Sequence, residues 1–145
     1  MQDSDLAQVV SIERHTQISP WSRLSFEESL ISEHHCRCLV NNDRVVGYSV
    51  VQPIVDELHI LNIVIAPSQQ GKGYSHDLMN DIFSLAQARQ TSKIFLDVRE
   101  SNMPARALYA KWGFEQISVR KNYYRTDQPD QRETALIYLR RISPA

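Results

Sequence analysis

The segment Gln70-Gly71-Lys72-Gly73-Tyr74-Ser75 decides the fold that this sequence predicts. An apolar run, residues 60–65, comes before it, and a segment with the apolar period of an amphipathic helix comes after it. The first N–H groups of a helix lack partners within the helix and lie at the positive end of its dipole. Glycine lets the backbone bend at such a point and lets an anion approach closely. The segment therefore predicts a cradle for a phosphate group, and the chain is expected to bind a phosphorylated small molecule.

The spacing of the two glycines excludes the two commonest phosphate-binding loops. A P-loop needs four residues between its first glycine and a Gly-Lys-Ser/Thr triplet, and the segment lacks this arrangement. A dinucleotide-binding fingerprint needs a third glycine at the position of His76. A lone Gly-x-Gly pair is also common in plain turns, so the prediction depends on the residues that follow.

A second apolar run and a short helix follow the glycine segment. Residues 94–98 have the composition of a buried strand, so strand, helix and strand predict one βαβ unit with parallel strands. In the next helix Asn102 or Met103 stands at the N-cap, Pro104 in the first turn and Gly113 just past the end.

Together these motifs resemble the GNAT acetyltransferases, which use acetyl-coenzyme A. The resemblance lies in Gln-x-x-Gly-x-small at residues 70–75 and in Ser-Asn-x-x-Ala-x-x-Leu-Tyr-x-x-x-Gly-Phe at residues 101–114. Three further segments narrow it to the bacterial ribosomal-protein-alanine N-acetyltransferases (RimI type): Pro20-Trp21-Ser22, Asp97-Val98-Arg99 and Arg120-Lys121-Asn122-Tyr123-Tyr124. The resemblance covers nearly the whole chain.

The composition is that of one ordinary globular domain. The chain has 145 residues, 42% of them hydrophobic and 23% charged, which is enough for a proper core. A net charge of −1 argues against direct nucleic-acid binding, and no apolar run is long enough to cross a membrane. No signal peptide is visible, and only two cysteines occur, which fits a reducing cytoplasm. We expect a cytoplasmic protein that is a monomer or a weak dimer.

The resemblance implies a GNAT fold of the α/β (α+β) class: a mixed, mostly antiparallel sheet with a central parallel pair and flanking helices. Residues 1–145 would form a single N-acetyltransferase domain. Its strand before the first helix would be short or missing, because only Met1-Gln2-Asp3 precede that helix. The expected helices cover residues 4–15, a stretch after Trp21, the segment after the glycine loop and the segment around Tyr109. The expected strands are residues 36–40, 45–51, 59–65, 94–99, 114–120 and 134–139. Between the first two, Asn41-Asn42-Asp43-Arg44 predicts a hairpin.

The resemblance also implies where acetyl-CoA would bind. The backbone of Ile63, Val64 and Ile65 would pair with the pantetheine arm as an added strand does. Asn102 would cap its helix and contact the cofactor arm. The pyrophosphate would lie on a loop formed by Gln70, Gly71, Lys72, Gly73, Tyr74, Ser75 and His76. Lys72 could equally be a solvated surface lysine.

Asp97 is the candidate general base. It interrupts an apolar strand, and the RimI-type enzymes have a catalytic glutamate at the matching position. Aspartate is one methylene shorter, which favours proton removal through a water molecule. The alternatives are an ion pair with Arg99, an exposed position at a strand end, and His59 as the base.

Tyr109 is the candidate general acid, since the family uses the matching tyrosine to protonate the coenzyme A thiolate. A phenol with a pKa near 10 stays protonated and able to donate at neutral pH. The alternative is an aromatic core residue beside Leu108 and Trp112. No metal is expected: the stretch from His34 to Cys38 lacks the second, distant ligand pair of a zinc site.

These observations predict transfer of acetyl from acetyl-CoA to the N-terminal α-amine of a protein. By resemblance the acceptor is the alanine of a small-subunit ribosomal protein, entering near Asp97, His59 and the Tyr123/Tyr124 segment. Two alternatives stay open at this point. One is an acetyltransferase that acts on a lysine, a polyamine or an antibiotic amine, and the other is a non-catalytic acyl-CoA binding module.

Overall fold

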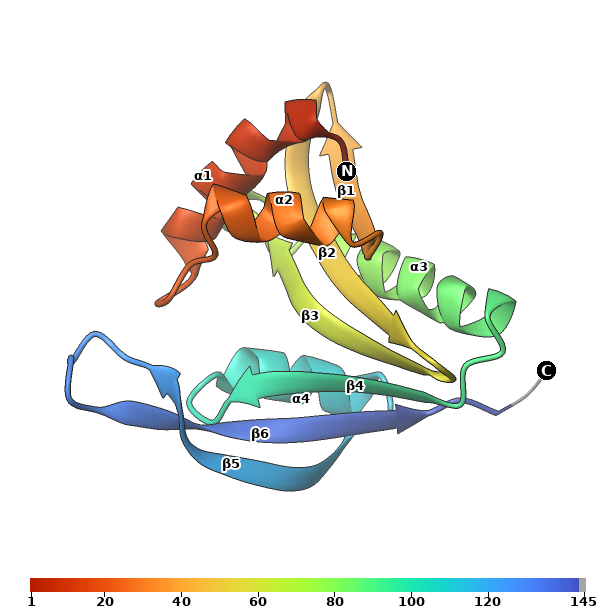
Figure 1. Cartoon of the computed structure of the whole chain (residues 1–145), viewed down its shortest axis with the longest axis vertical. Coiled ribbons are helices and arrows are strands. Elements are labelled where there is room, and N and C mark those ends of the chain that lie inside the picture. The colour runs from red at the N-terminus through yellow and green to blue at the C-terminus, as the bar shows by residue number, and fades with distance from the viewer. Residues whose placement is uncertain (144–145) are drawn as a thin grey trace.

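A mixed sheet of six strands is the centre of the molecule, with α-helices on both faces (Figure 1). The structure is a computed structural model that describes residues 1–143. The strand order is β1-β2-β3-β4-β6-β5; β3 and β4 are parallel, and all other neighbours are antiparallel. The strands are β1 (His35–Asn41), β2 (Arg44–Ile54), β3 (Glu57–Ile65), β4 (Lys93–Arg99), β5 (Glu115–Arg125) and β6 (Arg132–Arg141). The α-helices are α1 (Leu6–Thr16), α2 (Arg23–Ile31), α3 (Tyr74–Ala88) and α4 (Met103–Lys111), and short 3₁₀ turns occupy Asp3–Asp5 and Pro67–Gln69. The predicted fold class is therefore confirmed.

Two clusters of buried side chains hold the helices to the sheet. On one face, α1 and α2 place Leu6, Val9 and Phe26 against Tyr48 and Val50 of β2. The second cluster joins apolar residues of α3 and α4 to β3, β4 and β6. Figure 1 shows α1 and α2 in front of the strands and α3 and α4 behind them.

The helix α2 packs on the core through two of its apolar residues. Its N-cap Ser22 accepts a hydrogen bond from the Ser25 amide. Phe26 is fully buried, and Leu30 is partly buried against the same cluster. Leu24 and Ile31, in contrast, expose 61% and 81% of their surface.

The turn between β1 and β2 is the predicted hairpin. Asn42 and Asp43 have φ values of 52° and 63°, which two-residue hairpin turns require at both central positions. At the other end of the chain, β5 is longer than the sequence predicts, because the strand continues after a register shift between Arg120 and Tyr124. Asn122, with φ of 55°, lies in this shift.

Among residues 1–143, the structure has no strand before α1. Met1 and Gln2 have no regular structure, and Gln2 is followed by the 3₁₀ turn. The Met1 ammonium donates a hydrogen bond to the Cys36 carbonyl of β1 over 3.0 Å. This contact places the first residue beside the edge strand of the sheet.

Candidate active site

The strands β3 and β4 separate after four paired positions. Their parallel pairing runs from Glu57–Lys93 to Ile60–Leu96 and stops there. On the other side of β3 the pairing with β2 shifts register at the same point, so Leu61 is an extra, bulged residue. A bulge bends its strand, and Figure 1 shows β3 and β4 diverging. The edge of β3 that faces β4 therefore has no neighbouring strand from residue 61 to residue 65, which leaves an opening between the parallel strands.

One cavity, of about 320 Å³, lies along this free edge and ends at the glycine loop. It is bounded by the end of β3, the loop before α3 and the inner side of α4. The predicted cofactor residues that line it are Ile63, Val64, Ile65, Gln70, Gly71, Gly73, Tyr74, Ser75 and Asn102. Sequence reasoning missed Gln69, Pro104, Leu108 and Trp112, which also line it.

The geometry of the glycine loop suits an anion. Gly71 and Gly73 have φ values of 79° and 82°, and a Cβ added to either would meet no other atom within 4 Å. Gly73 is the N-cap of α3 and provides no side-chain cap. The helix has 15 residues, and its first N–H groups have no side-chain cap at its positive end, where the His76 amide bonds to the Gly73 carbonyl. An anion would be stabilised at this end.

Two of the predicted cofactor residues do not line this cavity. The Lys72 ammonium donates to the side-chain oxygen of Gln69 over 3.1 Å. His76 points to α4, where its Nδ1 accepts a hydrogen bond of 3.2 Å from the Trp112 indole. The contact between His76 and Trp112 joins the start of α3 to the end of α4.

A second cavity, of about 640 Å³, lies on the other side of the opening. Its walls are the loop between α1 and α2, the diverging halves of β3 and β4, and the end of β5. Asp97, Tyr123 and Tyr124 line it. The two cavities meet, because both are lined by Ile63, Asn102, Ala105 and Tyr109.

Asp97 lines the larger cavity from β4, is an exposed residue as one of the alternatives expected, and forms no ion pair with any residue between 1 and 143. Partial loss of surrounding water raises the pKa of its carboxyl above the usual value, and the charges of Arg120 and His59 partly oppose this shift. Arg99, the ion-pair partner considered from the sequence, lies 3.3 Å from Glu133 instead. His59 lies 3.1 Å from Glu57 and does not line the cavity.

Tyr109 lies where the two cavities meet. Its ring packs among Trp112, Phe114 and Tyr138, with centroid distances of 6.5, 5.9 and 6.3 Å. Burial raises the pKa of its phenol to about 12. The phenol is therefore protonated at every physiological pH.

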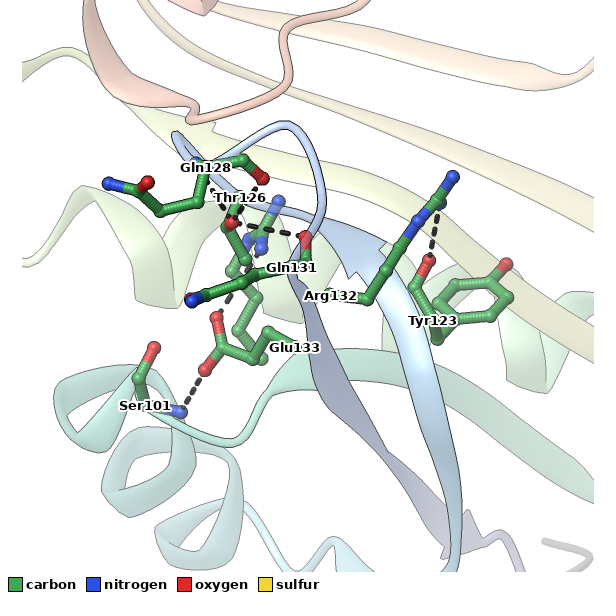
Figure 2. A network of polar contacts seen from close by, with 8 residues as sticks. Ser101, Tyr123, Thr126, Gln128, Gln131, Arg132 and Glu133 are labelled. Carbon is green, nitrogen blue, oxygen red and sulfur yellow. Dashed lines mark hydrogen bonds and ion pairs between the residues drawn. The ribbon is translucent and has the colours of Figure 1, made fainter.

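The start of β6 is bonded to the end of β4 and to Ser101 (Figure 2). Glu133 accepts hydrogen bonds from the Ser101 amide and from Arg99, over 2.7 and 3.3 Å. Arg99 in turn lies over the ring of Tyr124, 4.4 Å from its centroid. These contacts connect the wall of the larger cavity to the first residues before α4.

Sequence reasoning missed the contribution of α1 and its following loop to the larger cavity. Glu13 and residues 17–22 of this region supply several of its lining side chains. Glu13 is 1% exposed, although it is a carboxylate. An acidic residue inside the apolar face of the predicted first helix was the available signal.

Residues 1–143 provide neither a group of metal ligands nor a membrane-spanning helix. No three His, Cys, Asp or Glu side chains are grouped so that they could hold a metal ion, and Cys36 and Cys38 are free thiols. No helix in this range has both the length and the apolar content needed to cross a bilayer.

Comparison with known proteins agrees with this geometry. Residues 6–114 match the acetyltransferase (GNAT) family. The [ribosomal protein bS18]-alanine N-acetyltransferase of Haemophilus ducreyi is 32% identical over 136 residues, which are 93% of this chain and 92% of that protein. The crystal structure of the ribosomal-protein-S18-alanine N-acetyltransferase from Escherichia coli superposes with a TM-score of 0.91 at 30% identity, over 100% of this chain and 92% of that one.

A more distant structure shares the fold alone. Arabidopsis thaliana Naa50, in complex with a bisubstrate analogue, has a TM-score of 0.84 at 18% identity and covers 98% of this chain and 95% of its own. The family match spans well over half of the chain, and the bacterial relatives match nearly all of it. This chain belongs to the acetyltransferase (GNAT) family, whose members use acetyl-CoA as the acetyl donor.

Proposed function

We propose that this protein transfers acetyl from acetyl-CoA to the α-amine of the N-terminal alanine of ribosomal protein bS18. The observation that carries this proposal is the meeting of two cavities at Tyr109, one with an anion cradle and one with room for a peptide. The likeness to bS18-alanine N-acetyltransferases supports the acceptor, because it extends over more than nine-tenths of the chain. Residues 1–145 would act as a single domain.

Acetyl-CoA would lie in the smaller cavity. The glycine loop would hold the pyrophosphate through backbone N–H groups, and the free edge of β3 would pair with the amides of the pantetheine arm. The lining of the cavity favours Gln70, Gly71, Gly73, Tyr74 and Ser75 for the pyrophosphate. Lys72 would act only through its charge, and His76 only through its contact with Trp112.

The reaction would need three proton transfers. Asp97 would take a proton from the acceptor ammonium through a water molecule, and the neutral amine would attack the thioester carbonyl. The nitrogen of the tetrahedral intermediate then carries a positive charge, and the intermediate would collapse with loss of the C–S bond. Tyr109 would donate its proton to the departing thiolate, since it is protonated and lines both cavities. The second proton of the nitrogen would restore the Tyr109 phenol, and Asp97 would release its proton to water.

The chemistry of the base favours an α-amine over a lysine side chain. An α-amine has a pKa of about 7.7–8.0, so roughly a seventh of it is neutral at pH 7. A lysine amine, with a pKa of about 10.4, is almost wholly charged. A carboxylate that acts through a water molecule is a weak base, and it suits the α-amine, which loses its proton more easily than lysine does.

Comparing protein N-termini by mass spectrometry, in cells with and without this gene, tests the proposal. We expect the N-terminal alanine of bS18 to be acetylated only where the gene is present. Full acetylation of bS18 in both strains, or gene-dependent acetylation confined to lysine side chains, would contradict it.

A further inference from the structure

Glu13 is a buried carboxylate for which the proposed reaction has no use. It lies in the last two turns of α1, is 1% exposed, and lines the larger cavity. Its Oε1 accepts from the Tyr48 hydroxyl over 2.6 Å, and its Oε2 accepts from the Trp21 amide over 3.0 Å. The Asn62 amide donates to both oxygens over 3.1 Å. No basic side chain between residues 1 and 143 forms an ion pair with it.

The partners of Glu13 explain why a carboxylate occupies this position. A buried charge is costly unless hydrogen bonds satisfy it. All of its partners present donors, and an ionised carboxylate is the side chain that offers acceptors only. Glutamine would turn an NH₂ group toward at least one of these donors and leave that donor without an acceptor.

Glu13 contacts the loop between α1 and α2 through the Trp21 amide. Residues 17–22 form this loop, and five of them line the larger cavity. At its ends, backbone bonds run from Gln17 to Glu13 and from Phe26 to Ser22, within the caps of α1 and α2. The bond from the Trp21 amide to Glu13 adds a polar contact between α1 and this loop, one residue before the N-cap of α2.

The second connection is to β3, at the point where the cavity opens. Asn62 follows the bulged residue Leu61, and both line the larger cavity. Glu13 thus joins two walls of the larger cavity, loop 17–22 and β3. Tyr48, in contrast, reaches Glu13 from β2 and lines neither cavity.

We propose that Glu13 is a positioning residue for the acceptor, which sets the distance between loop 17–22 and Asn62 and so holds the incoming N-terminus against Asp97 and Tyr109. The identity of the acceptor in this inference rests on the proposed function. Glu13 touches no reacting atom in this account. Its loss should weaken use of the acceptor and leave acetyl-CoA binding unchanged, because it does not line the smaller cavity.

The test compares Glu13→Gln with Tyr48→Phe. Both variants disturb the same buried carboxylate, but only the first removes one of the acceptor oxygens that the Trp21 and Asn62 amides share. With a synthetic bS18 peptide that begins with alanine, we expect Glu13→Gln to raise the acceptor KM about tenfold, the effect of one lost buried hydrogen bond. The acetyl-CoA KM and the values for Tyr48→Phe should stay within about twofold of wild type.

A second measurement does not depend on the acceptor. Hydrogen exchange of the Trp21 backbone amide, followed by NMR, should be about tenfold faster in Glu13→Gln and unchanged in Tyr48→Phe. Equal exchange rates in all three proteins would overturn the inference, even if wild type fails to acetylate the peptide. If wild type acetylates the peptide and both variants raise the KM equally, Glu13 has only a structural role.

Glu13→Asp provides for the case in which Glu13→Gln does not fold. It keeps the charge and shortens the reach to all three partners by one methylene. The same changes in acceptor KM and in Trp21 exchange are expected, and their absence in a variant that melts cooperatively overturns the inference.

Discussion

Replacing Asp97 with asparagine separates a catalytic role from a structural one. Asp97 forms no ion pair among the described residues, and desolvation raises the pKa of its carboxyl in the folded protein. A raised pKa means that the folded state favours the protonated form. Its contribution to the free energy of unfolding is therefore present below the unfolded pKa of about 3.9 and lost as the pH rises through the folded value. At pH 7 Asp97→Asn should melt at the same temperature as wild type or higher.

The effect on rate should have the opposite sign. Loss of a general base lowers turnover by about 10²–10⁴, and we expect about a hundredfold at pH 7, because part of the α-amine is already neutral. Between pH 7 and 9 the neutral fraction of the amine rises from about a seventh to above nine-tenths. The variant should therefore recover about sevenfold over this range. Asp97→Glu should be active, since it restores the residue of the related enzymes.

The assay is kcat/KM for the bS18 peptide against pH, together with thermal melts. Asp81→Asn is the matched control: hydrogen bonds from His35 and Arg37 outweigh desolvation and lower the pKa of Asp81, which lines neither cavity. Asp81→Asn should lower the melting temperature at pH 7 and leave the rate unchanged. The reasoning is refuted if Asp97→Asn melts lower than wild type and keeps both the rate and the shape of its pH profile.

Three further predictions concern the general acid Tyr109, the glycine loop and Glu133 of β6. Tyr109→Phe should lower turnover about a hundredfold and leave the affinity for acetyl-CoA unchanged. Steady-state kinetics and calorimetry measure the two quantities, and turnover near that of wild type would mean that Tyr109 is structural. Gly73→Val should abolish acetyl-CoA binding in calorimetry, because it disfavours φ of 82° and fills the open space, whereas Lys72→Ala should change affinity only modestly; equal affinities in both variants would count against the loop. Glu133→Gln should lower the free energy of unfolding by about 1–2 kcal/mol at pH 7, since hydrogen bonds from Ser101 and Arg99 outweigh desolvation and lower the pKa of Glu133. That difference should shrink as the pH falls through the folded pKa of Glu133, and a pH-independent difference in chemical denaturation would contradict it.

The fold could be predicted because its signals are local. Alternating and continuous apolar runs indicated the strands, and Asn42-Asp43 indicated the first hairpin. Pro104 and Gly113 marked the ends of α4 to within a few residues. The parallel pair followed from the order of strand, helix and strand.

The extent of β5 could not be predicted in the same way. Residues 120–125 are charged and aromatic, and the sequence was interpreted as a strand that ends at Arg120. The structure continues the strand past an irregular register at Asn122. Pairing with β6 supplies the stability there, and a pairing partner distant in sequence leaves no local signal.

In the candidate site, too, residues in local motifs could be predicted, and residues with partners distant in sequence could not. The glycine loop and Tyr109 lie in compact motifs, and the structure places them along one cavity. The direction of Lys72 depends on the conformation of its own loop, where it bonds to Gln69. The direction of His76 depends on Trp112, which is 36 residues away, so it required the tertiary structure. The role of Glu13 was invisible for the same reason, because its partners come from a loop, from β2 and from β3.

The most direct test of the account is to map the acetylated position after the reaction of purified protein, acetyl-CoA and bS18. Tandem mass spectrometry of the product distinguishes the alanine α-amine from every lysine side chain. The account predicts acetyl on the α-amine alone, and no product with Tyr109→Phe over the time in which wild type completes one turnover. Acetyl on lysine, or no transfer to bS18 by a wild-type protein that binds acetyl-CoA, would contradict it.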